Sequence, residues 1–492
     1  MKPSGRRSRL LVSALLLGTA SASLAGNGMN SPGFGAVQLG MAGAGTAMAE
    51  DSMAILRNPA AGAWLNSGSA FDLGFAFPLG STQVSGVGES STTGLMTLSK
   101  GRRDSIEGVF SIPTYARNWR LSNRVSLGWG VAAAGLKAFT ESGSATLARG
   151  LPPLEADCNG SFGGGSPTRP LTDLTELCGD ASSRLGVDLA QVLVSGHFAY
   201  RAAPTLSLGI APILAAQRMS VTGLGAFAEF SNSPEHTTDN GFDYAWGGGF
   251  RAGFLWQPVT GFGIGAAYQS RLWQTRFDLY EGTVVGGSFD LAPTLNIGTQ
   301  FHFFPGHRLL LDYEHIDYSV IKPLAHSMHG QHFSDGCFVP RVLARSLPSA
   351  PALPACLGGS DGPGFGWKSL NVYKLGYQAR LGEQLSVRVG MSWGGNPAGS
   401  QQAFSQLFAP AITDKHVSLG ISWRRKSGGH LDIALLHGLS NHLREKSILS
   451  NAELRLLDGE IVGFDVKADE SDQVFESKMR VWQLHVSWSL FN

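Results

Sequence analysis

The sequence has little charge for its length. Only 15% of its 492 residues are charged, against roughly 25% in an average soluble domain. Lysine and arginine (38) balance aspartate and glutamate (37), which leaves no basic excess to bind a phosphate backbone and argues against nucleic acid as a partner. The hydrophobic content of 43% is too high for a disordered chain.

Long uncharged apolar runs are missing beyond the N-terminus, so no transmembrane helix is predicted. The N-terminus carries four basic residues: Lys2, Arg6, Arg7 and Arg9. An apolar run at 10–20 and a group of small residues follow, and this order is typical of a secretory signal peptide. We therefore expect residues 1–25 to be removed, with cleavage after Ala25 or after Ala22. A membrane anchor is the alternative, but the run is short for one.

Cysteine is scarce, with four in the chain, and the four form two local pairs in Gly/Pro-rich sequence. In an exported protein this arrangement predicts two disulfides that staple loops, Cys158–Cys178 and Cys337–Cys356. Zinc is the alternative, but neither pair has CxxC spacing, so no metal site is predicted.

Beyond residue 69 the dominant hydrophobic period is two. Near the C-terminus, apolar residues from Trp482 to Leu490 alternate with small or polar ones, as in a half-buried strand. About fourteen such runs can be counted, with ends uncertain by about two to four residues. The predicted strands are 70–79, 105–116, 124–136, 190–202, 205–218, 244–257, 261–273, 289–303, 307–318, 369–380, 384–394, 414–424, 430–440 and 478–490.

The connections between these strands alternate between long loops and tight turns. Long loops at one end and short turns at the other are typical of a bacterial outer-membrane barrel, and the strand lengths suit tilted spans of about 9–11 residues. Tryptophans near strand ends support an aromatic girdle. We predict an all-β transmembrane antiparallel barrel over residues 70–492, with periplasmic termini and the largest extracellular loops at 137–189 and 319–368. A secreted β-sandwich array is the alternative, but its loop lengths would not alternate.

Residues 26–69 do not alternate and are rich in glycine and alanine. A barrel of about fourteen strands has a lumen wide enough to leak, so this segment is predicted to fill it as a plug, or hatch. A phosphate-binding loop is the alternative, but no strand precedes the glycines and no Lys-Ser/Thr follows them.

Several motifs resemble one known family. Residues 40–51 (GMAGAGTAMAED), followed by Asn58-Pro59-Ala60, resemble the N-terminal hatch of the FadL family. Residues 244–256 with 263–271, and residues 410–423, resemble that family's sixth, seventh and twelfth strands. The family comprises outer-membrane transporters of long-chain fatty acids and, in the TodX-like branch, of aromatic hydrocarbons.

The resemblance implies a fourteen-stranded barrel with a hatch and no open channel. It implies that an apolar extracellular groove captures the substrate, that a deeper pocket receives it, and that it leaves sideways near the third strand. The expected activity is uptake of hydrophobic compounds: long-chain fatty acids in the first place, with hydrocarbons of the same fold, or a general porin or adhesin, as alternatives. The expected partners are these compounds, outer-membrane lipid and lipopolysaccharide, and the barrel-assembly machinery, with no cofactor.

Four groups of residues are candidates for these roles. Asn58, Pro59 and Ala60 would position the hatch; Leu224, Phe227 and Phe230 would line the groove; Arg251, Lys374 and Arg388 face the lumen by alternation and would bind a carboxylate; Gly128, Gly130 and Gly135 would permit a lateral opening. Each has an ordinary structural alternative. The groove residues would pack the loop onto itself, the cations would pair with lumen acids such as Asp312 or Glu314, and the glycines would be common strand residues.

Two other constellations are weaker. His326, His329 and His332, near Asp335, have the composition of a metal site but lie in a long loop. His437 and Ser440 are spaced i, i+3, which places them on opposite faces of a strand, so no enzyme activity is predicted.

The plug hypothesis is tested by deleting residues 26–50. We expect the deletion to raise the leakage of small solutes or antibiotics across the outer membrane, because the lumen would be open. Unchanged leakage, with the barrel still present in the membrane, would contradict the plug.

Overall fold

The computed structural model describes fourteen segments of the chain. They are residues 27–86, 96–98, 101–105, 109–141, 145–147, 155–156, 169–170, 184–343, 352–398, 413–425, 428–447, 452–458, 460–467 and 470–491.

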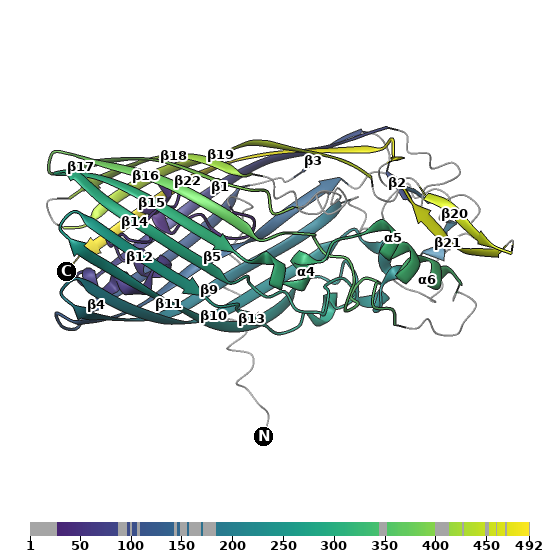
Figure 1. The fold of residues 1–492 in the computed structure, drawn as a ribbon, viewed down its shortest axis with the longest axis horizontal. Helices are drawn as coiled ribbons and strands as arrows, with labels where there is room; N and C mark the ends of the chain where they lie inside the picture. The colour runs from purple at the N-terminus through teal and green to yellow at the C-terminus, as the bar shows by residue number, and fades with distance from the viewer. Residues whose placement is uncertain are drawn as a thin grey trace, which may run out of the picture.

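Antiparallel strands form one closed sheet (Figure 1). The sheet has sixteen strands, but β3 and β4 share the place between β1 and β5, and β12 and β13 share the place beside β11. Because each of these two pairs of strands occupies a single place, the sixteen strands fill fourteen positions around the barrel. The pairing of β1 with β22 closes the ring. The predicted fourteen-stranded antiparallel barrel is therefore confirmed. Its barrel strands are β1 (Gly68–Ser85), β3 (Gly101–Ser105), β4 (Phe110–Arg120), β5 (Val125–Glu141), β9 (Arg184–Ala203), β10 (Leu206–Thr222), β11 (Asp243–Val259), β12 (Phe262–Gln269), β13 (Trp273–Gln274), β14 (Thr294–Phe304), β15 (His307–Ile316), β16 (Leu370–Leu381), β17 (Leu385–Gly394), β18 (Lys415–Arg424), β19 (His430–Lys446) and β22 (Val474–Phe491).

The other elements are short. Three local strand pairs are β2 (Met96–Leu98) with β6 (Ala145–Leu147), β7 (Glu155–Ala156) with β8 (Arg169–Pro170), and β20 (Ala452–Leu457) with β21 (Glu460–Val466). The helices are α2 (Gly35–Leu39), α3 (Ala54–Arg57), α4 (Lys322–Ala325), α5 (Gly330–Phe333) and α6 (Val339–Leu343), with 3-10 turns η1 (Pro59–Trp64), η2 (Gly225–Phe230), η3 (Pro234–His236), η4 (Asp278–Tyr280) and η5 (Tyr318–Val320) and a π-helical turn η6 (Ser334–Phe338). Among the described residues, no helix combines the length and the apolar character that crossing a membrane requires.

The alternation along each strand separates a polar interior from an apolar exterior. On β22, Trp482, Leu484, Val486, Trp488 and Leu490 are exposed on the outer face, while the residues between them are buried. Exposed aromatic and aliphatic side chains recur on the outer face of neighbouring strands. A continuous apolar band of this kind is rare on soluble proteins and is typical of a surface that faces lipid.

Several predicted strands differ from the observed ones. Some are predicted to end too early, and one predicted strand is divided in the structure. The strand predicted at 430–440 continues to Lys446. The prediction ends too early because residues 441–446 are mostly polar on both faces and show no apolar period. The strand predicted at 261–273 divides into β12 and β13, and Leu272 between them pairs instead with Leu291. Beyond the lipid-facing band the hydrophobic pattern no longer indicates a strand, although the main-chain pairing of β19 with β22 continues.

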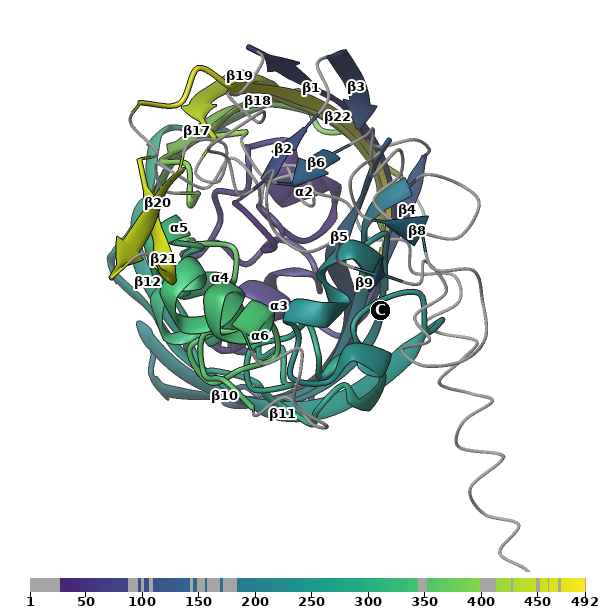
Figure 2. The ribbon, with the colours of Figure 1, turned by 90° about the vertical axis from the view of Figure 1, so that its right-hand side faces the viewer.

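Residues 27–67 lie inside the barrel, as Figure 2 shows in purple. The helix α2 contacts β18, β19 and β22, and η1 contacts β9, β10 and β11, so the segment reaches opposite walls. Two wall glycines allow this close approach. A Cβ at Gly390 would overlap with the main chain of Met41, and one at Gly209 would overlap with the main chain of Ala60.

Substitution of Gly390 by valine is expected to push the main chain at Met41 away from the wall, because no free space exists there for the new side chain. Overpacking of this kind costs about 1–3 kcal/mol. We expect greater leakage of small solutes through the barrel, measured as antibiotic sensitivity. Gly196→Val is the matched control, since a Cβ at Gly196 meets nothing within 4 Å. Equal leakage in the two variants would refute close packing of the segment.

Candidate functional site

Buried ion pairs hold the lumen segment, residues 27–67, against the barrel wall. Glu314 on β15 lies between two cations, Arg57 of the segment at 3.0 Å and Lys374 of β16 at 2.7 Å. Both cations also donate to the main-chain oxygen of Pro32. All three charged groups are almost fully buried, so each needs the others: an unpaired buried charge is strongly destabilising.

A second cluster surrounds Glu50. Its carboxylate pairs with Arg388 at 2.8 Å and with Arg308 at 3.0 Å, and Arg388 also lies 3.7 Å from Asp432. Burial by itself raises the pKa of Glu50, but the two guanidinium groups lower it to about 2. Among the described residues no cation lies within ion-pair distance of the neighbouring Asp51, and burial together with the carboxylates of Asp432 and Glu50 raises its pKa to about 8.

Asn58 is fully buried and satisfies three main-chain groups. Its side-chain nitrogen donates to the carbonyl oxygens of Thr46 (3.0 Å) and Phe254 (2.9 Å), and its oxygen accepts from the amide of Ala60 (3.1 Å). The last bond caps η1, and Pro59 occupies the first turn, where its missing N–H is no loss. The Asn-Pro-Ala motif thus joins two parts of the lumen segment to β11.

Arg251 differs from the other two predicted lumen cations. Lys374 and Arg388 are paired with acids, as the structural alternative for them expects. Arg251, on β11, donates to Gln269, and its guanidinium lies 5.9 Å from the ring centroid of Phe34, but no carboxylate lies within ion-pair distance of it among the described residues. It lines a small polar cavity of about 50 Å³ between the lumen segment and the wall.

The same cavity reaches β5 at a place where the sheet is interrupted. The β4–β5 ladder runs from Arg120–Ser126 to Thr114–Ala132, and the next described pair on that side of β5 is Ser105–Thr140. The cavity is lined by Ala132, Ala133 and Ala134, at the start of this interruption. Pro113, the next residue of β4, has no N–H to continue the ladder.

The three candidate glycines of β5 lie in different surroundings. Gly135 falls within the interruption and has φ +142°, which favours glycine. Gly128 and Gly130 lie in the regular ladder, where a Cβ would press on Ile55 and Leu56 of the lumen segment. The structure thus places only Gly135 where the wall is interrupted.

An apolar cavity of about 120 Å³ lies at the end of the barrel that carries the loops. Leu224 and Phe227 line it, whereas Phe230 packs behind it with its ring centroid 5.0 Å from that of Phe338. The other lining side chains come from β9, β10 and two further loops, and they include Val187, Leu189, Met219, Val221, Val284, Val285, Phe289, Met328, Phe333 and Phe365. Among the described lining residues Thr283 carries the one hydroxyl, the others are apolar, and none is charged.

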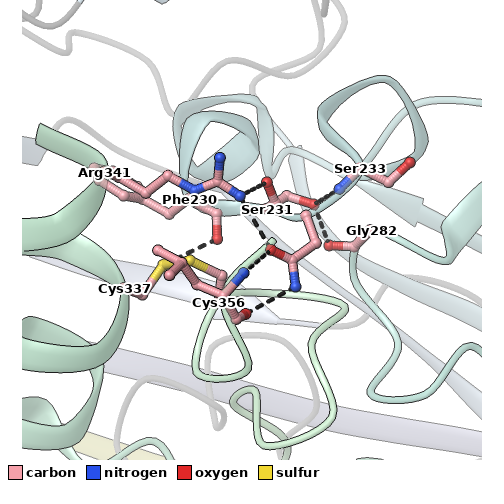
Figure 3. Close-up of a disulfide and its surroundings, with 9 residues drawn as sticks. Phe230, Ser231, Ser233, Gly282, Cys337, Arg341 and Cys356 are labelled. Atoms are coloured by element: carbon pink, nitrogen blue, oxygen red, sulfur yellow. Dashed lines mark hydrogen bonds between the residues drawn. A yellow bond between two sulfur atoms is a disulfide. The ribbon is translucent and has the colours of Figure 1, made fainter. Parts of the chain in front are cut away.

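The loops around this cavity are joined to one another. A disulfide connects Cys337 with Cys356, and the Cys337 sulfur lies 3.3 Å from the main-chain oxygen of Phe230 (Figure 3). Arg341 donates to the carbonyl of Ser231 at 2.9 Å, and the Ser231 hydroxyl donates to Gly282 at 2.7 Å. Three loops distant in sequence therefore form one cap. The predicted pair Cys158–Cys178 lies outside the described residues.

The two cavities follow one another along β9. Val187 and Leu189 line the apolar cavity, and Gln191 and Leu193, the next inward positions, line the polar one. Because alternate residues of a strand face the same side, the polar cavity continues the apolar one towards the lumen segment.

Sequence reasoning missed the cap residues of 283–289 and 328–333, and also the acid Glu50. Apolar side chains within long loops were the available signal for the cap. Two histidines of the 319–368 loop lie beside one acid: His332 is 3.0 Å and His326 4.0 Å from Asp361. Among the described residues no three His, Cys, Asp or Glu side chains are grouped as metal ligands.

Solved structures share this architecture over nearly the whole chain. The Pseudomonas putida toluene transporter TodX is 14% identical with a TM-score of 0.57, a Pseudomonas aeruginosa FadL homologue is 15% identical with 0.56, and the Ralstonia pickettii toluene transporter TbuX is 16% identical with 0.51. Each match covers 94% of this chain and 99% of the other. The chain has the fold of the FadL and TodX transporters. No protein-family model matches the sequence, and no curated protein matches it. The FadL-type fold implied by the sequence motifs is thus confirmed by structure.

Asn58→Ala is expected to loosen the lumen segment, because two buried carbonyls and one amide lose their partner. Each unsatisfied group costs about 1–3 kcal/mol. We expect a lower thermal unfolding temperature and greater antibiotic leakage. Asn66→Ala is the control, since Asn66 is exposed and, among the described residues, its side chain has one hydrogen bond, from Arg120. Wild-type stability in Asn58→Ala would show that the motif does not anchor the segment.

Proposed function

We propose that this protein is an outer-membrane transporter of the FadL type that takes up hydrophobic small molecules. The observation that carries the proposal is the capped apolar cavity at the loop end of a closed, lipid-facing barrel. We place that end outside the cell, after export through a cleaved signal peptide (1–25). We assign to the hatch the segment predicted at 26–69, up to the start of β1 at Gly68.

The cavity is suited to a hydrophobic solute. Burying one CH₂ group is worth about 0.8 kcal/mol, so a dry cavity can extract such a solute from water. An apolar cavity of about 150 Å³ is large enough for benzene. The cavity, at about 120 Å³, is of comparable size, and we infer that it takes one aromatic ring or a short length of an acyl chain.

Two substrate classes follow from two observations. Arg251 favours a long-chain fatty acid, because a guanidinium without a carboxylate partner is available to pair with the substrate's own. The uncharged lining of the outer cavity favours a neutral aromatic hydrocarbon instead. The related toluene transporters, TodX and TbuX, support this second candidate.

Lateral release completes the proposed route. The polar cavity borders the interruption between β4 and β5, so a substrate beside Arg251 lies next to a wall position where the described ladder stops. Leaving there delivers an apolar molecule to lipid and not to water. Lys374 and Arg388 hold the hatch in this proposal and do not touch substrate. Glu314 also lines the polar cavity, where Arg57 and Lys374 neutralise its charge.

The test measures uptake of radiolabelled oleate and of toluene by outer-membrane vesicles that carry the protein. Ala133→Trp is expected to reduce uptake to the level of empty vesicles, because the new side chain fills the polar cavity at the interruption. Val194→Trp on β9 is the control, since Val194 faces lipid. Arg251→Gln is expected to lower oleate uptake about ten-fold and leave toluene uptake unchanged if the substrate is a carboxylate. If neither compound exceeds background while small sugars pass, a porin is the better account.

A further inference from the structure

Four neighbouring strands extend past the apolar band at the loop end. They are β3, β1, β22 and β19, which lie side by side along the upper edge of Figure 1. On the outer face of β22, Arg480 and Lys478 follow Trp482 at two-residue intervals. At about 3.4 Å per residue they lie about 7 and 14 Å along the strand beyond this tryptophan. Because exposed tryptophans mark the membrane interface, both cations stand at headgroup level.

A groove of about 450 Å³ opens on this outer surface. Arg102 and Asp104 of β3 line one side, Leu79 of β1 lies beside them, and Lys478 and Arg480 of β22 line the other. The strand register supports the grouping, since Leu79 pairs with Arg480 and Ser81 pairs with both Lys478 and Asp104. The groove therefore has a cationic rim directly above the lipid-facing band.

The charge of this surface is positive overall. Among the described side chains, the charged ones that point outward here are five cations (Arg102, Arg444, Lys446, Lys478 and Arg480) and two acids (Asp104 and Glu476), and His442 lies 2.8 Å from Glu476. Both acids are already paired: Arg102 lies 3.1 Å from Asp104, and Lys478 lies 2.9 Å from Glu476. In the described part of the chain the guanidinium group of Arg480 has neither a hydrogen bond nor an ion pair.

A second observation links the groove to acyl chains. Leu79 is 49% exposed and pairs directly with Arg480, so an apolar side chain stands next to the unpaired guanidinium. Below it, Trp482 stacks on His437 at 3.8 Å and continues the band. A ligand that fills this surface carries an anionic group joined to hydrocarbon. Guanidinium groups bind phosphate through two parallel hydrogen bonds, and the phosphate of a phospholipid or glycolipid headgroup can accept both.

We propose that this groove binds the phosphate of an outer-leaflet lipopolysaccharide molecule, with Arg480 as the principal contact and Arg102 and Lys478 as its flanks. The acyl chains of the bound lipid lie along Leu79 and Trp482. This site is outside the barrel and separate from the transport route, so it depends on the proposed membrane location and not on the substrate.

The test uses the purified full-length protein in detergent with bisphosphorylated lipid A as the probe, and native mass spectrometry counts the lipids retained. We expect wild type to retain lipid A, Arg480→Glu to bind it about ten-fold more weakly, and Arg480→Lys to keep most of the binding because the charge remains. Lys368→Glu is the matched control, since this exposed lysine follows the cap and is remote in sequence from the groove. Heat-modifiable mobility on gels confirms that each variant is a folded barrel.

Two further measurements separate the sources of phosphate. Lipid A stripped of its phosphates should not be retained above the level of Arg480→Glu, and equimolar inorganic phosphate should not displace the intact lipid. Equal retention of the stripped lipid, or an equal loss in Lys368→Glu, would overturn the phosphate contact. Displacement by inorganic phosphate would show a free-anion site and overturn the lipid assignment.

Discussion

The pairing of β1 with β22 is the constraint on which the structure depends. Eighteen residues of β1, Gly68–Ser85, pair in register with Phe491–Val474, and this ladder joins the first strand to the last. In lipid an unpaired sheet edge leaves N–H and C=O groups without partners, so the barrel must close. Closure also fixes which face of every strand is inside. At the seam itself, His485 of β22 meets Asp72 of β1 at 2.8 Å within the lumen.

A closed barrel with a polar interior needs something to fill it. The lumen segment does so with two chemical devices. Small residues let its main chain touch the wall, as at Gly209 and Gly390, and charged residues meet opposite charges on the wall, as Arg57 meets Glu314. Buried charges of this kind add little net stability but penalise any arrangement that leaves one unpaired. The segment is therefore held in one position more by specificity than by hydrophobic burial.

The two cavities and the interruption of the ladder lie along one side of the barrel. The apolar cavity under the cap, the cavity beside Arg251 and the interruption between β4 and β5 follow one another along β9 and β5. Each is a place where the general rule of the fold is relaxed: a loop is buried, a cation lacks its acid, and a ladder stops. Relaxed local rules of this kind are where function is expected in a folded protein.

The barrel could be predicted from the amino-acid sequence, because a period of two, alternate long and short connections and a glycine-rich segment before the first strand are local signals. The sequence also indicated Asn58 and predicted that Lys374, Arg388 and Arg251 face the lumen. It could not indicate which of these cations is neutralised, since Glu50 and Glu314 are distant from them in sequence and meet them only in the folded barrel. Strand ends beyond the lipid-facing band, such as 441–446, and the joining of three loops into a cap were decided there too. Neither depends on a local hydrophobic period: the first follows from main-chain pairing and the second from contacts between segments far apart in the chain.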